Sequence, residues 1–257
     1  MIHVTVAGVV VADSQPCDAL GAGAPQRTYQ APVAKSPSDP GPNHKETITV
    51  YLFNRSGTAK REHFIEARAY AVEIAAKVTT ITGRPITAFS GTFGYPLGTL
   101  SWSTRFETHA DMHDMFAKLA ADPGYVEIIQ RNAHMFDSWN EDTLVNVVSS
   151  TLTPTPRPIY EVTTAVVANG KLAAAMAFGV KAQEYVAKAT GFPTAFVAQT
   201  YGPFGAVGWL TGASDMAEAE KIQDMWRTDT TFATMVDEGG DLFIPGAARN
   251  GLIEKVD

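Results

Sequence analysis

The chain has almost no cysteine: Cys17 is the only one among 257 residues. A single cysteine cannot form an intrachain disulfide, and it cannot supply the paired thiolates of a zinc knuckle. The sequence therefore excludes small disulfide-stabilised secreted domains and cysteine-based metal sites.

Positive charge and long apolar runs are also scarce. The chain has 20 Lys and Arg against 27 Asp and Glu, a net charge of −7, and no basic cluster, which argues against nucleic acid as a partner. The longest apolar run, Val4 to Ala12, is about half of what a membrane-spanning helix needs. The run could be the middle of a signal peptide, but no Lys or Arg precedes it and its valines fit a strand equally well, so we expect a cytoplasmic protein without a membrane span.

Proline divides the chain into three parts. Residues 1–45 contain six prolines among Gly, Ser, Asp and Ala, a composition that cannot bury enough apolar surface to offset its ordering entropy. We expect a flexible leader there, or an arm that orders against a partner subunit. A second cluster, Pro154, Pro156 and Pro158, predicts a stiff linker between residues 46–153 and 157–257.

The two blocks are copies of one unit. A shift of 107 residues pairs Thr87-Ala88-Phe89 with Thr194-Ala195-Phe196, and Trp102 with Trp209. Nine identities fall between residues 87 and 122 at this shift, against about two or three expected from composition. The sequence therefore indicates an internal duplication.

Each copy predicts the same order of strands and helices. In the first copy, alternation and helical spacing indicate strands at 47–53, 86–93, 99–106 and 144–149, with helices at 58–82 and from Thr108 onward. In the second copy the strands are 159–167, 194–201, 206–211 and 252–256, with helices at 171–190 and 215–227. The order β-α-β-β-α-β is that of a ferredoxin-like unit. The predicted fold class is α+β, with two tandem ferredoxin-like repeats packed sheet to sheet as an internal dimeric α/β barrel.

Several short segments resemble NIPSNAP domains. They are Ile159-Tyr160-Glu161-Val162 with Asn169-Gly170-Lys171-Leu172, the turns and strands that run to Trp102 and Trp209, and Asp122-Pro123-Gly124-Tyr125. The Arg-x-Tyr element of that family is missing in both copies, and Asp229-Thr230 lacks the proline. The resemblance covers residues 46–257 and implies the dimeric α/β barrel superfamily, whose members enclose small molecules between sheet and helices.

What the resemblance implies about function is broad. The superfamily includes cofactor-independent oxygenases, isomerases, cyclases and haem-binding proteins, and fold alone does not choose among them. We expect a protein that handles a small hydrophobic or aromatic molecule, with no cofactor. The alternatives are a haem-binding protein and a non-catalytic assembly protein that self-associates as a homo-oligomer.

Six side chains are candidates for the site. His109 and His113 lie four residues apart and share one helix face, where they could move a proton or ligate haem iron. A metal would need a third ligand from His63, His134 or Asp114, so no metal site is predicted. Tyr51 is a third catalytic candidate, and Trp102, Trp209 and Tyr160 are candidates to line the pocket.

Overall fold

A computed structural model describes residues 49–137 and 140–257, which belong to one compact unit. The leader predicted for residues 1–45, and Cys17 within it, lie outside the described residues. The first repeat contains β1 (Tyr51–Thr58), α1 (Phe64–Thr82), β2 (Thr87–Phe93), β3 (Thr99–Phe106), α2 (His109–Ala121), α3 (Pro123–Asn132) and β4 (Glu141–Ser150), with short 3-10 helices η1 (Arg61–His63) and η2 (Ala133–Met135). The second contains β5 (Ile159–Val166), α4 (Leu172–Thr190), β6 (Thr194–Tyr201), β7 (Ala206–Ala213), α5 (Met216–Thr228), α6 (Thr230–Glu238), η3 (Gly240–Leu242) and β8 (Arg249–Lys255).

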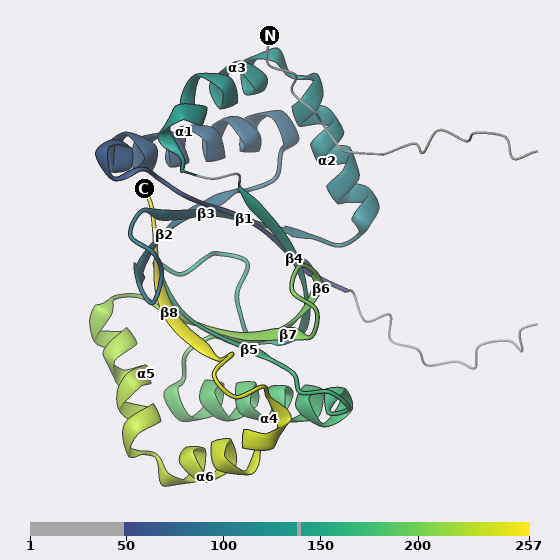
Figure 1. The fold of residues 1–257 in the computed structure, drawn as a ribbon, viewed down its shortest axis with the longest axis vertical. Coiled ribbons are helices and arrows are strands. Elements are labelled where there is room, and N and C mark those ends of the chain that lie inside the picture. The colour runs from purple at the N-terminus through teal and green to yellow at the C-terminus, as the bar shows by residue number, and fades with distance from the viewer. Residues whose placement is uncertain (1–48, 138–139) are drawn as a thin grey trace, which may run out of the picture. The chain divides into compact units, whose positions relative to one another are not determined.

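The eight strands close into one barrel in the order β1-β3-β2-β8-β5-β7-β6-β4. The pairs β2–β8 and β4–β6 join the two repeats, and every pair is antiparallel. Figure 1 shows α1, α2 and α3 outside one half of the barrel and α4, α5 and α6 outside the other half. The predicted fold class, two ferredoxin-like repeats forming an internal dimeric α/β barrel, is confirmed.

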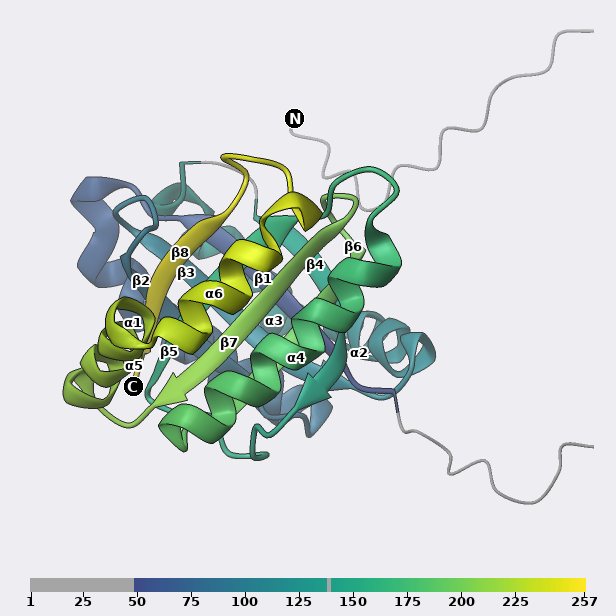
Figure 2. The same cartoon turned by 90° about the horizontal axis from the view of Figure 1, so that it is seen from below.

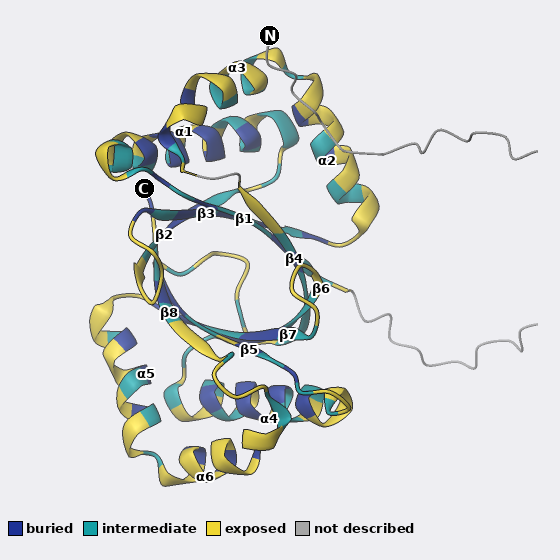
Figure 3. Cartoon of the chain, viewed as in Figure 1, coloured by how far each residue is buried: buried dark blue, intermediate teal, exposed yellow. Residues whose placement is uncertain are grey.

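Alternate side chains of the strands point outward from the barrel and pack against the helices. Along β3 every second residue is buried, from Leu100 through Trp102 and Thr104 to Phe106, because successive side chains of a strand point to opposite faces. These residues pack on Ala67, Tyr70 and the rest of the inner face of α1. Figure 3 shows the burial concentrated where helices and barrel meet, and Figure 2 shows α4 and α6 lying across the strands from outside. None of the helices in the described ranges has the length and apolar content needed to cross a membrane.

Local sequence signals set most helix ends. Gly83 and Gly191 end α1 and α4 in the left-handed conformation, with φ of 71° and 72°, which glycine adopts at little cost. The helix predicted from Thr108 onward is α2, and Thr108 caps it, since its Oγ1 accepts a hydrogen bond from the Asp111 amide at 3.1 Å. Asp122 caps α3 in the same way, accepting from the Tyr125 amide at 2.7 Å.

Two predictions of local structure were wrong. The helix predicted from Thr58 begins at Phe64, because the chain up to Thr58 continues β1 and pairs with β3 as far as Thr99. Helices α3 and α6 were not predicted. Asp122 follows the end of α2, and its side chain caps α3, in which Pro123 occupies the first turn, where no amide hydrogen is needed.

The duplication has a change of register that the constant shift of 107 concealed. Trp102 pairs with Ala88, whereas Trp209 pairs with Phe196, so Phe196 corresponds to Ala88 at a shift of 108. The match of Thr87-Ala88-Phe89 to Thr194-Ala195-Phe196 is therefore wrong by one residue. The shift of 108 also gives seven identities between residues 67 and 85, ending with Gly83-Gly191 and Pro85-Pro193. The β6–β7 hairpin is one residue shorter than β2–β3, which restores 107 from β3 onward.

Candidate functional site

A cavity lies between the sheet of the first repeat and helices α1, α2 and α3. Its volume is about 50 Å³, room for a few water molecules and less than the roughly 300–1,000 Å³ of usual ligand sites. Its walls are mainly apolar and aromatic, with a few polar groups. The lining residues are Phe53, Arg55, Tyr70, Ile74, Ala75, Val78, Ile86, Trp102, Ser103, Thr104, Met115, Phe116, Leu119, Tyr125, Ile129 and Asn140.

Arg55 brings a cation to the cavity wall and is held by Asp142 on the neighbouring strand. Its Nε and Nη2 each donate to one carboxylate oxygen of Asp142, both at 2.7 Å. This two-point contact raises the pKa of Arg55 above its ordinary value, against the opposing effect of burial. The guanidinium carbon also lies 5.9 Å from the ring centres of Phe53 and Phe116. Arg55 is therefore a fixed, permanent cation on the cavity wall, and the hydroxyl of Tyr125, another lining residue, also favours its charged form.

Tyr70, in the middle of α1, supplies the neutral polar group. Burial is the main cause that raises the pKa of its hydroxyl, so the phenol stays protonated at neutral pH. The hydroxyl has no hydrogen-bond partner among the described residues, while its ring packs edge-on against Trp102 and Phe136, with centres 6.1 and 5.8 Å apart. A protonated hydroxyl without a protein partner is free to donate to a bound molecule.

Trp102 lines the cavity with its ring, and its indole nitrogen has a structural role. Nε1 donates to the Ala71 carbonyl at 3.0 Å, and Nε1 of Trp209 donates to the Gly179 carbonyl at the same distance. Each tryptophan thus ties its sheet to the long helix of its own repeat. Trp209 does not line the cavity and packs instead among the rings of Phe178, Phe196 and Phe243.

In the second repeat, larger side chains occupy the corresponding space. At the shift of 108, Ala75 and Ala88 correspond to Gln183 and Phe196, and both larger residues are fully buried. The Phe196 ring lies directly against Gly179, where an added Cβ would approach the ring to 2.1 Å. The two halves of the barrel are alike in fold, and they differ in the space left between sheet and helix.

Tyr51 and His109 lie together, away from the cavity. Their ring centres are 4.7 Å apart, and His109 also lies 5.7 Å from the ring of Tyr201 on β6. His113 lies on the exposed surface of α2. None of these three candidates lines the cavity.

Tyr160 lies on the opposite face of the sheet, inside the barrel. It pairs with Ile253 of β8 and packs edge-on against Phe89, with ring centres 5.8 Å apart. Its hydroxyl accepts a hydrogen bond from the Arg157 amide at 3.0 Å. Tyr160 is thus separated from the cavity by the sheet.

A haem does not fit this arrangement. The porphyrin is much larger than the cavity, and neither His109 nor His113 faces into it.

Arg55, Tyr70 and Tyr125 were missed by reasoning from the sequence. Arg55 fell between the predicted strand and helix, so nothing placed it on a sheet face. Tyr70 fits the apolar stripe of α1 and reads as core. Aligning the two repeats at a shift of 108 could have indicated both residues. In that alignment Tyr70 corresponds to Phe178 and Arg55 corresponds to Thr163, so the first repeat has a polar or charged group that the second repeat lacks.

No protein-family model and no curated protein sequence matches the chain. Among solved structures, a proposed monooxygenase from Fusobacterium nucleatum is similar over 82% of this chain and 94% of its own, with a TM-score of 0.63 and 7% identity. An anthrone oxidase-like protein is similar over 82% of this chain and 93% of its own, with a TM-score of 0.59 and 13% identity. A NIPSNAP family protein from Agrobacterium tumefaciens is similar over 41% of this chain and 97% of its own, with a TM-score of 0.35 and 17% identity. The predicted resemblance to dimeric α/β barrel proteins is confirmed at the level of the fold.

Proposed function

We propose that the first-repeat cavity binds a small aromatic or otherwise hydrophobic molecule that carries a carbonyl or phenol oxygen. The observation that supports this most directly is the Tyr70 hydroxyl, which lies in an apolar wall without a partner among the described residues, beside the cation of Arg55. Apolar walls with a few convergent polar groups are typical of small-molecule sites. Because the cavity is small, the ligand must displace side chains such as Phe116 as it enters.

The reaction we propose is cofactor-independent and passes through an enolate or phenolate of the substrate. The cavity-lining residues include no carboxylate or imidazole, so the proton of the substrate passes to water, and Arg55 and the Tyr70 hydroxyl donate hydrogen bonds to the negative oxygen that remains. The anion then regains the proton at another carbon in an isomerase, closes a ring in a cyclase, or transfers electrons to O₂ in an oxygenase. The names of the similar structures, a proposed monooxygenase and an anthrone oxidase-like protein, favour the oxygenase.

A second proposal concerns Tyr51 and His109, which could exchange a proton with a molecule on the surface beside α2. Their ring contact of 4.7 Å supports it. His113, one turn further along the helix, would act at the same surface.

We also propose a cytoplasmic location, supported by the single Cys17, and self-association of the chain.

Binding of small phenols and aryl ketones, followed by native mass spectrometry and titration calorimetry, tests the cavity. Tyr70→Phe removes one oxygen and is expected to weaken binding about tenfold, the value of one hydrogen bond. Arg55→Gln should weaken it further. The control is Tyr185→Phe, which removes a hydroxyl that donates to Asp229 at 2.8 Å and should lower stability without changing affinity.

Three outcomes would contradict this proposal. Unchanged affinity in Tyr70→Phe and Arg55→Gln would show that the ligand does not bind in the cavity. Loss of activity in His109→Asn with full binding in the cavity variants would favour the surface beside α2. A large particle without any retained ligand would favour the assembly protein.

A further inference from the structure

A cluster of metal-ligating side chains lies apart from the cavity, at the start of α1. His63, Glu66 and His134 each offer one ligand atom, and these atoms lie within 4.8 Å of one another. We propose that the His63–Glu66–His134 cluster binds a divalent transition-metal ion such as Zn²⁺. It is the only such group of three or more His, Cys, Asp or Glu among the described residues.

Backbone hydrogen bonds bring the two segments of the cluster together. The Lys60 amide donates to the Met135 carbonyl at 2.8 Å, and the Asp137 amide donates to the Thr58 carbonyl at 3.0 Å. Ala59 and Phe136 form an isolated antiparallel bridge between the same segments. η1 and η2 are therefore held side by side by the main chain, whatever their side chains bind.

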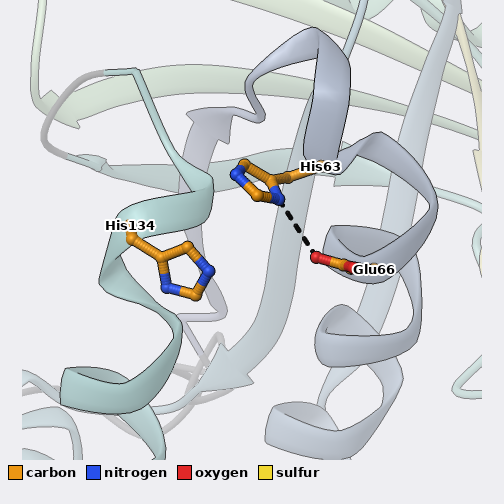
Figure 4. A group of neighbouring side chains, drawn as sticks. All are labelled: His63, Glu66 and His134. Atoms are coloured by element: carbon orange, nitrogen blue, oxygen red, sulfur yellow. Dashed lines mark hydrogen bonds and ion pairs between the residues drawn. The ribbon is translucent and has the colours of Figure 1, made fainter.

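The side chains are oriented toward a common point (Figure 4). His63 Nδ1 lies 3.0 Å from Glu66 Oε2, and the rings of His63 and His134 are 5.1 Å apart at 84° to each other. Ligand atoms of a tetrahedral site, each about 2.1 Å from the ion, are about 3.4 Å apart. Because all three side chains are at least partly exposed, small rotations can close the remaining gap.

The tautomer of His134 also suits a ligand. Its Nδ1 lies 2.9 Å from the Arg131 carbonyl, and a carbonyl only accepts, so Nδ1 carries the hydrogen. The lone pair is then on Nε2, and Figure 4 shows this far ring nitrogen directed toward His63 and Glu66. A ligating histidine that donates its other N–H to a backbone carbonyl is the usual second-layer arrangement of metal sites.

The donor set selects the class of ion. Two imidazoles and one carboxylate suit Zn²⁺ and its first-row neighbours, whereas Ca²⁺ and Mg²⁺ prefer oxygen ligands alone. Three protein ligands leave a fourth tetrahedral position for water or another exchangeable group. Without the ion, His63 Nδ1 donates its hydrogen to the Glu66 carboxylate, so metal binding releases that hydrogen as a proton.

Titration calorimetry of the tag-free, full-length chain with ZnCl₂ tests the proposal. We expect one Zn²⁺ per chain, at least tenfold weaker binding in His63→Asn and in His134→Asn, and no binding of MgCl₂. Absorption of Co²⁺ in the visible range, which reports tetrahedral coordination, should be lost in the same variants. The side chain of His63 is partly exposed and that of His134 is exposed, and circular dichroism checks that the variants are folded.

Two control variants separate this cluster from the other histidines. His109→Asn with His113→Asn removes two histidines four residues apart on α2, and His3→Asn with His44→Asn removes those before residue 49. Both should bind Zn²⁺ as the original chain does. Undiminished binding in the double variant of His63 and His134, loss of binding in either control, or no binding in the original chain would overturn the proposal.

Discussion

Glu161 carries a carboxylate into a nearly closed space between β5 and α5. It is 5% exposed, its Oε1 accepts from Gln223 Nε2 at 2.7 Å, and its Oε2 has no partner among the described residues. Burial raises the pKa of this carboxyl, with the Gln223 hydrogen bond opposing. The native chain therefore holds this proton to a higher pH than the unfolded chain does.

This residue predicts a pH-dependent loss of stability. Because the pKa of Glu161 is raised in the native state, the free energy of unfolding falls as pH rises through the unfolded pKa toward the folded one. Glu161→Gln removes the charge, so its stability relative to the original chain should improve from pH 4 to pH 7 in urea denaturation. As a control, Glu220→Gln changes an exposed residue of α5 and should leave the pH dependence of stability unchanged. Parallel stability curves for Glu161→Gln and the original chain would contradict this account.

A single residue also limits how well the site could be predicted. Trp102 is a candidate from the sequence because it repeats as Trp209, whereas Arg55 has no repeated partner and corresponds to Thr163. Its place on the cavity wall depends on β1 continuing to Thr58, which is set by pairing with β3, a contact distant in sequence. Local sequence patterns carry no information on that pairing, so Arg55 could not be predicted as a residue of the cavity wall.

At the scale of elements, the two repeats differ in the size of the side chains that face each other between strand and helix. In the first repeat β2 and α1 face each other with Ala88 and Ala71. In the second repeat β6 and α4 present Phe196 and Gly179, and the ring fills the place of a missing Cβ. The two pairs are alternative solutions to one packing problem.

Exchanging these pairs gives the second prediction. Ala88→Phe alone should destabilise the first repeat by about 1–3 kcal/mol, because the new ring meets the Ala71 side chain. Ala88→Phe with Ala71→Gly should recover part of that loss and bind no ligand in the cavity. Thermal and urea unfolding of the single and double variants measures the coupling. Additive losses would show that the second repeat's packing cannot be transferred to the first.

Element boundaries were predictable where a residue has one strong local preference. The helices predicted to end at residues 82 and 190 do end there, each followed by a glycine, and the helix predicted from Thr108 onward begins directly after that residue. The failures came from Asp122 and Asp229, because an aspartate at the junction of two helices ends one and caps the next. Whether such an aspartate only ends a helix or also caps a second one can be predicted only when the residues that follow it are considered as a helix.

At the scale of the whole molecule, the barrel contains two similar halves and one described cavity with a partnerless hydroxyl. Native mass spectrometry should therefore find one small-molecule ligand per chain, whatever the number of chains in the particle. Phe178, at the position of Tyr70, lacks the hydroxyl that we propose contacts the ligand. Two ligands per chain, with equal affinity, would contradict the assignment of the site to the first repeat.

The joining of the two halves in one chain has a further consequence for inheritance. In a barrel made from two identical chains, every substitution appears twice, so neither half can change without the other. Here the strand pairs β2–β8 and β4–β6 join two halves that have different sequences within one chain, so each half can change by itself. A change that filled the space beside Phe196 did not have to be matched beside Ala88. Substitutions can therefore fill the space between sheet and helix in one half of the barrel and leave the cavity of the other half unchanged.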